Sequence, residues 1–263
     1  MTSSFWRFPA PSLRFVPVFR RNFLVWRKLA LASILSNIAD PLITLVAFGY
    51  GLGRLLPQVE GVDYIVFLAA GSACMSTAMA ASFESLYSAF SRMHVQRTWE
   101  AILNAPLELE DVLVAEWLWA AAKSTFAGVS IIAVVFALGV SREPTLLLLV
   151  PVVMITGLAF SAIGLCFNAL ARGYDFFAYY FTLLLTPMVF LSGVYYPVAQ
   201  LPEWLVPVAS SLPLATAVDL ARPLVRGELP GLQQAICAVA ALLGVAFAAF
   251  YVALLLTRRR FVA

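Results

Sequence analysis

The sequence is poor in charge, in histidine and in cysteine, and each shortage excludes a class of protein. Only 12% of the 263 residues are charged, against roughly a quarter in water-soluble domains, whereas 62% are hydrophobic. The single histidine excludes the usual zinc and haem sites, and the net charge of +3 is too small to indicate a nucleic-acid partner. The three cysteines lie in separate apolar stretches, so we expect small buried side chains at Cys74, Cys166 and Cys237.

Long apolar runs take the place of the missing charge. A membrane-spanning helix needs about 20 mainly apolar residues. Six segments reach this length, at 31 to 53, 64 to 88, 113 to 139, 146 to 170, 177 to 196 and 232 to 256. We therefore predict an all-α membrane protein with six transmembrane helices. The first run follows a basic segment without a small-residue cleavage site, so a cleaved signal peptide is not expected.

Lysine and arginine are distributed unevenly between the loops. Twelve lie before the first run, after the second and fourth runs, or at the C-terminus, whereas four lie in the remaining loops. Cytoplasmic loops of membrane proteins carry the excess of basic residues. The distribution therefore predicts that both termini are cytoplasmic.

The N-terminal segment, residues 1–30, has a helical pattern of its own. Phe15, Phe19, Phe23 and Trp26 fall within one arc of a helix, and basic residues occupy the other face. This pattern predicts an amphipathic helix in the membrane interface, with its aromatic face among the lipid headgroups. Its basic face would contact lipid phosphates or a cytoplasmic partner, and a simple topology signal without a partner is the alternative.

The connection between the fifth and sixth runs, residues 197–230, is interrupted by several prolines and cannot form another span. Two apolar pieces within it, 204 to 212 and 215 to 224, have the length of short helices. We expect short re-entrant helices here, which are tolerated where protein or a water-filled cavity satisfies their backbone.

Few ionisable residues lie within the predicted spans: Asp40, Glu84, Glu116 and Lys123. Charges at this depth are expensive and are usually paired or functional. Glu116 and Lys123 are seven residues apart, two helical turns, so both project from one face of the third span. We expect a structural ion pair between them, which Glu84 could share. A direct substrate contact or a proton relay is the alternative.

The chain has no phosphate-binding loop. That loop requires Gly-x-x-x-x-Gly-Lys-Ser/Thr, and neither Lys28 nor Lys123 stands in this context. Gly49, Gly51 and Gly53 close an apolar run instead of joining a strand to a helix, so they favour close helix packing over nucleotide binding. The chain is therefore not expected to be an enzyme or to hold a cofactor, and ATP with Mg would bind another subunit.

The loop 91–111 after the second run is the most informative cytoplasmic stretch. Apolar residues recur at helical spacing from Trp99 to Leu107, and Pro106 ends the predicted helix. A short rigid helix between two spans could receive movement from a soluble motor. An ordinary interfacial helix is the alternative.

Several motifs in this order resemble the ABC-2 type permeases. Phe-Glu-Ser-Leu-Tyr at 83–87, Thr-Trp-Glu-Ala at 98–101 and Ala-Ala-Lys at 121–123 look like the second transmembrane helix, the coupling helix and the third helix of that family. Leu-Ser-Gly-Val-Tyr-Tyr-Pro at 191–197 and Asp-Leu-Ala-Arg-Pro at 219–223 are similar to the external region of nodulation-factor exporter (NodJ-like) permeases. The similarity runs through nearly the whole chain.

The resemblance implies a half-transporter of the bacterial inner membrane that forms a homodimer and binds two copies of an ATP-binding cassette subunit. The connecting helix in residues 1–30 and the loop 91–111 of the transmembrane domain, residues 31–263, would rest on that subunit. The cargo would be an amphipathic glycolipid, such as a lipo-oligosaccharide. A drug or lipid cargo is one alternative, and a secondary transporter driven by an ion gradient is another.

Three groups of residues are expected to carry this function. Coupling to the ATPase is expected from Arg97, Trp99, Glu100, Leu103 and Pro106. The pathway between the first, second and fifth spans would be lined by Phe48, Phe83, Phe177, Phe181, Met188 and Phe190, although aromatic residues at helical spacing are more often simple packing. An external gate is expected from Tyr195, Tyr196, Pro197, Asp219 and Arg222.

Overall fold

The computed structural model describes residues 12–56 and 58–262, without the side chains of residues 36, 37, 40, 41 and 262. The Asp40 side chain, one of the predicted intramembrane charges, therefore lies outside the described residues. The described part consists of helices and one two-stranded hairpin.

The α-helices are α1 (Phe15–Arg27), α2 (Ala30–Thr44), α3 (Tyr64–Phe83), α4 (Thr98–Leu103), α5 (Leu109–Ala137), α6 (Leu149–Leu170), α7 (Asp175–Tyr179), α8 (Thr186–Leu191), α9 (Val206–Ser210), α10 (Pro213–Arg226) and α11 (Leu232–Val262). Wider π-helical turns form η1 (Leu45–Tyr50), η3 (Glu84–Ser88), η4 (Ser91–Val95) and η6 (Tyr180–Leu185), and 3-10 turns form η2 (Leu52–Arg54), η5 (Pro144–Leu148) and η7 (Val198–Gln200). Strands β1 (Gln58–Val59) and β2 (Val62–Asp63) pair antiparallel.

Four helices of the described chain are long and apolar enough to cross a membrane: Tyr64–Val95, Leu109–Ala137, Pro144–Leu170 and Leu232–Phe261. They correspond to the second, third, fourth and sixth predicted spans. The first and fifth predicted spans overlap shorter apolar helices, Leu42–Arg54 and Asp175–Leu191. The structure therefore supports a membrane-embedded helical bundle.

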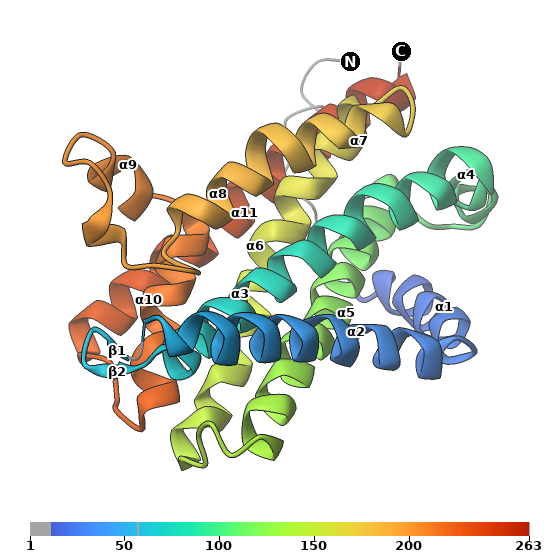
Figure 1. Ribbon diagram of the computed structural model, residues 1–263. Helices are drawn as coiled ribbons and strands as arrows, with labels where there is room; N and C mark the ends of the chain where they lie inside the picture. Colours follow the sequence, from blue (N-terminus) through green and yellow to red (C-terminus); the bar gives the residue numbers. More distant parts are fainter. Residues whose placement is uncertain (1–11, 57, 263) are drawn as a thin grey trace.

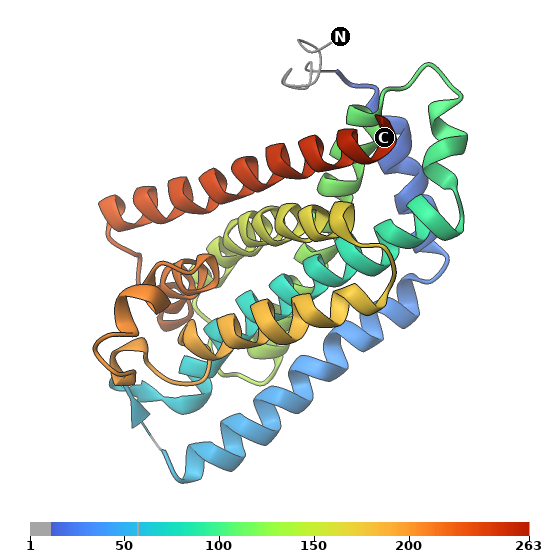
Figure 2. The same cartoon turned by 90° about the horizontal axis from the view of Figure 1, so that it is seen from above.

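The centre of the bundle is α6, which packs against α3, α5, α10 and α11. Figures 1 and 2 show α2 and α11 on opposite sides of this core. Small residues let the helices approach closely. A Cβ atom added at Gly128 of α5 would lie 2.4 Å from Thr77 Oγ1 of α3 and 2.8 Å from Val153 Cβ of α6. At Gly49 the added atom would meet Ile65 at 2.7 Å, which confirms the predicted packing role of this glycine.

The two ends of the bundle differ. One end, called here the hairpin end, carries β1, β2, α9 and α10, and the other, the α4 end, carries α1, α4 and the C-terminal part of α11 (Figures 1 and 2). Glu60 and Gly61 turn the hairpin with φ angles of 53° and 79°. Positive φ at both central residues is what a tight type I′ turn between two strands requires.

The predicted helix in the loop 91–111 exists as α4 but is shorter than expected. It ends at Leu103 with Asn104 as its C-cap, before Pro106 is reached. The ring of a proline disfavours helical backbone in the preceding residue, so the helix stops early. The next helix, α5, begins with a capping box in which the side chains of Glu108 and Asp111 accept hydrogen bonds from each other's backbone amides.

The N-terminal helix α1 is amphipathic as predicted, but its aromatic face contacts protein. The rings of Phe19, Phe23 and Trp26 lie 5.7, 6.3 and 6.0 Å from the ring of Trp119 on α5. Trp26 also stacks on Phe126 at 5.3 Å. The indole of Trp119 offers these rings an apolar partner, so the face expected among lipid headgroups lies against the bundle instead.

The connection 197–230 contains two helices, close to the apolar pieces identified in the sequence. Pro213 begins α10 at a position where its missing N–H costs nothing, and Gly227, with a φ of 87°, ends it. Helix α10 buries one face against α3, α6 and α11. The segment is thus an integral part of the bundle.

Candidate functional site

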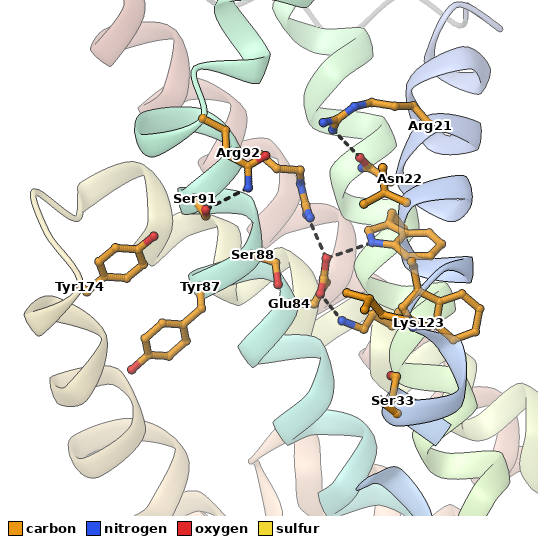
Figure 3. Close-up of a pocket in the computed structure, with 16 residues that line it drawn as sticks. Arg21, Asn22, Ser33, Glu84, Tyr87, Ser88, Ser91, Arg92, Lys123 and Tyr174 are labelled. Atoms are coloured by element: carbon orange, nitrogen blue, oxygen red, sulfur yellow. Dashed lines mark hydrogen bonds and ion pairs between the residues drawn. The ribbon is translucent and has the colours of Figure 1, made fainter. Parts of the chain in front are cut away.

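Arg92 occupies the centre of a buried charge cluster at the α4 end (Figure 3). Its Nε and Nη2 atoms donate to the Glu116 carboxylate at 2.9 and 2.5 Å, and Nη2 also reaches Glu84 Oε1 at 3.0 Å. Lys123 Nζ donates to the second oxygen of Glu84 at 2.6 Å. Two carboxylates and two cations are therefore joined in one chain of hydrogen bonds, called here the charge cluster.

Three neutral donors complete the charge cluster and bring two further helices to it. The indole N–H of Trp119 donates to Glu84 Oε1 at 2.9 Å. Glu116 Oε1 accepts from the indole of Trp99 on α4 and from the amide of Asn22 on α1, both at 3.3 Å. A single carboxylate on α5 thus contacts α1, α4 and the end of the second span.

Burial makes the pairing essential. The side chains of Glu84 and Glu116 are 2% and 1% exposed, Arg92 is 13% exposed and Lys123 26%. A carboxylate at this depth is stable only when its charge is paired and its oxygens are hydrogen-bonded. The two π-helical segments η3 and η4 carry Glu84 and Arg92, and wider turns of this kind are frequent at functional sites.

The predicted ion pair between Glu116 and Lys123 is replaced by a different pairing. Lys123 pairs with Glu84, the residue that was expected to share the pair. Glu116 pairs with Arg92 instead. The sequence interpretation assigned Arg92 to a cytoplasmic loop because the apolar run ends before it. The helix continues through η4, however, and the Arg92 side chain contacts Glu84, which lies eight residues, or about two helical turns, earlier. This spacing between Glu84 and Arg92 could have indicated the pair from the sequence.

The five predicted coupling residues are divided between the interior and the surface. Trp99 is buried, Leu103 is half-buried, and Arg97, Glu100 and Pro106 are exposed. Arg97 holds a left-handed backbone with a φ of 49°, an unfavourable conformation for a residue with a side chain. Helix α4 therefore contacts the charge cluster through Trp99 and presents a charged outer surface.

The basic C-terminus also contacts this end, which charge counting alone did not reveal. Arg258 forms an ion pair with Glu110 of α5. Arg260 Nη1 donates to the backbone carbonyls of Asn168 and Ala169 at 3.2 and 3.0 Å, where α6 ends. Cations stabilise the C-terminal carbonyls of a helix. The arginines that signalled topology thus also fasten α11 to α5 and α6.

The predicted lining residues do not share one environment. Phe48, Phe83 and Phe190 are exposed on the surface of the chain, and Phe181 is half-buried. Phe177 and Met188 are buried in the core. The first three rings thus lie at the surface of the chain, whereas Phe177 and Met188 pack inside the bundle.

The predicted gate residues meet at the hairpin end around Arg222. Its guanidinium donates to the carbonyl of Gly193, lies 3.5 Å from an Asp219 oxygen and covers the ring of Phe67 at 4.2 Å. Tyr195 donates to Met75 Sδ at 3.3 Å. These contacts fasten α10 to the loop after α8 and to α3.

The remaining expected gate residues lie nearby, Pro197 being buried and Tyr196 half-buried. The cysteines do not all match the expectation of burial: Cys74 is buried and Cys166 is half-buried, but Cys237 is exposed, because it lies on the outer face of α11. Within residues 12–56 and 58–262, no group of three or more His, Cys, Asp or Glu side chains could hold a metal ion.

Comparison with known proteins gives the family. The sequence model of the ABC-2 type transporter family matches residues 14–225. Nodulation protein J of Rhizobium leguminosarum bv. viciae is 49% identical over 84% of this chain and 85% of that protein. Nodulation protein J of Bradyrhizobium diazoefficiens is 44% identical over 96% of this chain and 95% of that protein. The inner membrane transport permease YadH of Escherichia coli is 24% identical over 64% of this chain and 67% of that protein. The chain therefore belongs to the ABC-2 type transporter family and is a permease similar to nodulation protein J.

Proposed function

We propose that this chain is the permease half of an ATP-driven exporter, and that its charge cluster passes movement from a separate ATP-binding subunit into the transmembrane helices. Family membership supports the first part, because ABC-2 permeases are membrane subunits that pair with an ATP-binding subunit. The contacts of α4 and α1 support the second.

The observation that carries the proposal is that one buried carboxylate, Glu116 of α5, contacts α1, α4 and η4 at the α4 end. A displacement of α4 would shift Glu116 through the hydrogen bond from Trp99. Arg92, which is bonded to both carboxylates, would pass this shift to Glu84 at the end of the second span. Packed cores and charge networks move between discrete arrangements, so they transmit small displacements over distance. The exposed Arg97 and Glu100 provide the surface on which the ATP-binding subunit would rest.

The proposed topology has six spans and cytoplasmic termini. The Leu42–Arg54 helix, continuing α2, would be the first span, and the Asp175–Leu191 helix the fifth. The basic residues concentrate at the α4 end in this arrangement, as the positive-inside rule requires. The hairpin end, with α9 and α10, would then lie outside, and its short helices would dip into the outer part of the membrane.

The functional unit would be a homodimer with two ATP-binding subunits. Phe48 and neighbouring apolar residues of α2 and η1 are exposed, as are Phe83 and Phe190. A second copy could cover these surfaces, and the cargo pathway would run between the copies. Cargo passes because its affinity differs between the two states that ATP binding and hydrolysis favour.

The proposed cargo is an amphipathic glycolipid, such as a lipo-oligosaccharide. Its support is the similarity to proteins named nodulation protein J and the resemblance to nodulation-factor exporter permeases. A permease for a drug or another lipid would share the same mechanism and differ in the side chains of the pathway.

The test is to express the chain with and without a candidate ATP-binding cassette subunit from the same genome, and to purify it through a tag on this chain. We expect co-elution in equal amounts and vanadate-sensitive ATP hydrolysis that increases with added lipo-oligosaccharide. A chain that transports cargo in vesicles without the partner, under a proton gradient alone, would favour the ion-driven secondary transporter, in which Glu84, Glu116 and Lys123 would carry the proton.

A further inference from the structure

A cavity of about 580 Å³ lies beside the charge cluster (Figure 3). It is bounded by the turn that joins α1 to α2 and by η3 and η4, which follow α3. Its lining combines charged and apolar side chains. Arg21, Arg92, Lys123 and Glu84 contribute the charges, whereas Trp26 and Leu29 contribute apolar surface. A cavity of this character suits a molecule with a polar head and an apolar tail.

The cavity and the adjoining charge cluster together hold three cations, Arg21, Arg92 and Lys123, for two carboxylates. Arg92 and Lys123 pair with Glu84 and Glu116 in the charge cluster. Arg21 forms no ion pair with the carboxylates of the described chain and donates instead to Asn22 Oδ1 at 3.0 Å and, more weakly, to Thr98 Oγ1 at 3.5 Å.

The surroundings of Arg21 penalise its charge. Burial and the neighbouring charge of Arg92 lower the pKa of Arg21, against the opposing effect of Glu116. An anion bound in the cavity would remove this penalty, and guanidinium groups recognise phosphate and carboxylate through paired hydrogen bonds.

The ring of Trp26 belongs to the apolar part of the lining. It is fixed by stacking on Phe126 at an interplanar angle of 10°. Its indole nitrogen is buried and, within residues 12–56 and 58–262, has no hydrogen-bond partner. Because this nitrogen is closed off from the cavity, a bound molecule would contact the ring and not the N–H.

The turn between α1 and α2 leaves a path by which the apolar tail of a bound molecule could leave the cavity. Val25 and Leu29 line the cavity and are exposed at the surface of the chain. In a helix that lies along the membrane interface, exposed apolar side chains contact acyl chains.

We propose that this cavity binds the anionic head group of a membrane amphiphile, with Arg21 and Lys123 contacting its oxygens and the tail leaving past the Trp26 ring and Leu29. The amphiphile is either a lipid of the surrounding leaflet or the exported cargo before transport. The second source rests on the proposed function, and the first does not.

The test measures equilibrium binding of radiolabelled dodecyl phosphate to the full-length protein in phosphatidylcholine nanodiscs, with empty nanodiscs as background. We expect Arg21→Gln to weaken binding roughly tenfold or more, the effect of removing a charge-assisted hydrogen bond. Arg21→Lys should restore most of the affinity. Arg20→Gln is the matched control, because Arg20 is the adjacent arginine and does not line this cavity.

Equal binding by Arg21→Gln and Arg20→Gln proteins would overturn the proposal. So would displacement of the label by uncharged dodecyl glucoside at the concentration at which unlabelled dodecyl phosphate displaces it.

Two further arms identify the source of the head group. Displacement by phosphatidylglycerol in the nanodisc would assign the cavity to a leaflet lipid, whereas displacement by a sulfated or phosphorylated lipo-oligosaccharide but not by phosphatidylglycerol would assign it to cargo. Because binding is measured without ATP or transport, a failed transport assay alone would count against the exporter function and leave this proposal intact.

Discussion

At the scale of single residues, the pairing of Lys123 decides how the charge cluster is held together. Lys123→Met leaves Glu84 with one cation fewer at membrane depth. Removing one partner of a buried pair is costly, and for a lysine that keeps some exposure we expect a loss of about 1–3 kcal/mol. Thermal unfolding in detergent, followed by near-ultraviolet circular dichroism, measures the change.

The double variants separate the observed pairing from the one expected from sequence. Adding Glu84→Gln to Lys123→Met removes the excess negative charge and keeps the contacts of Arg92 with Glu116 at 2.9 and 2.5 Å, so part of the lost stability should return. Adding Glu116→Gln should restore less, because it leaves Arg92 with its single 3.0 Å contact to Glu84. A rescue by the Glu116 variant and not by the Glu84 variant would mean that the carboxylate partners have been assigned wrongly.

A second residue-scale prediction concerns the hydrogen bond from α4 into the charge cluster. Trp99→Phe keeps a six-membered aromatic ring and removes the pyrrole part of the indole with its donor to Glu116, which should cost at least about 1 kcal/mol and loosen coupling. Cargo-stimulated ATP hydrolysis should fall more than basal hydrolysis. Trp117→Phe is the control, because it loses an equivalent bond to the Leu158 carbonyl inside the bundle. If both variants reduce stimulation equally, Trp99 has no special part in coupling.

At the scale of elements, the outer surface of α4 gives the sharpest prediction. Glu100 is exposed, so Glu100→Arg should leave insertion and folding intact. It reverses the charge on the surface where the ATP-binding subunit is proposed to rest, so transport should be uncoupled from hydrolysis. Reconstituted vesicles report both rates. Glu203→Arg, an equally exposed change at the hairpin end, should have no effect, and unchanged transport by Glu100→Arg would remove α4 from the docking surface.

Close packing between helices gives another element-scale prediction. Gly128→Ala places a methyl group against Thr77 and Val153, and overpacking of this kind costs typically about 1–3 kcal/mol. Gly244→Ala in α11 meets no described atom within 4 Å and should be neutral or slightly stabilising, since alanine favours a helix. Equal unfolding temperatures for the two variants would contradict the packing of α5 between α3 and α6.

The positions of the helices were more predictable from the sequence than the residues that each helix contacts. Hydropathy located the long helices because each must be apolar over its own length, and Pro106 marked the end of α4 to within a few residues. The aromatic face of α1 was recognised, yet its contact with Trp119 was not, because periodicity shows that a face is apolar and leaves its partner open. Arg92 was missed because the apolar run ends before it, and its partner Glu116 could not be identified because it lies on another helix.

At the scale of the whole molecule, the two ends carry different kinds of charge contact. The α4 end holds the charge cluster and the arginines of α11, whereas the hairpin end holds isolated pairs such as Arg226 with Glu60, 3.0 Å apart. A dense basic end is retained in the cytoplasm during insertion. The distribution of charge in the folded chain therefore agrees with the proposal that α4 faces the cytoplasm and the hairpin faces outward.

Cysteine labelling tests this orientation directly. In a chain whose three cysteines are replaced by alanine, a cysteine at Ala199, an exposed position at the hairpin end, should react with a membrane-impermeant maleimide in spheroplasts. A cysteine at Glu100 should react only after permeabilisation. Both positions are exposed in the folded chain, so a difference between them reports the side of the membrane and not burial. Labelling of Glu100→Cys in sealed spheroplasts would invert the proposed topology, and the ATP-binding subunit could then not reach α4.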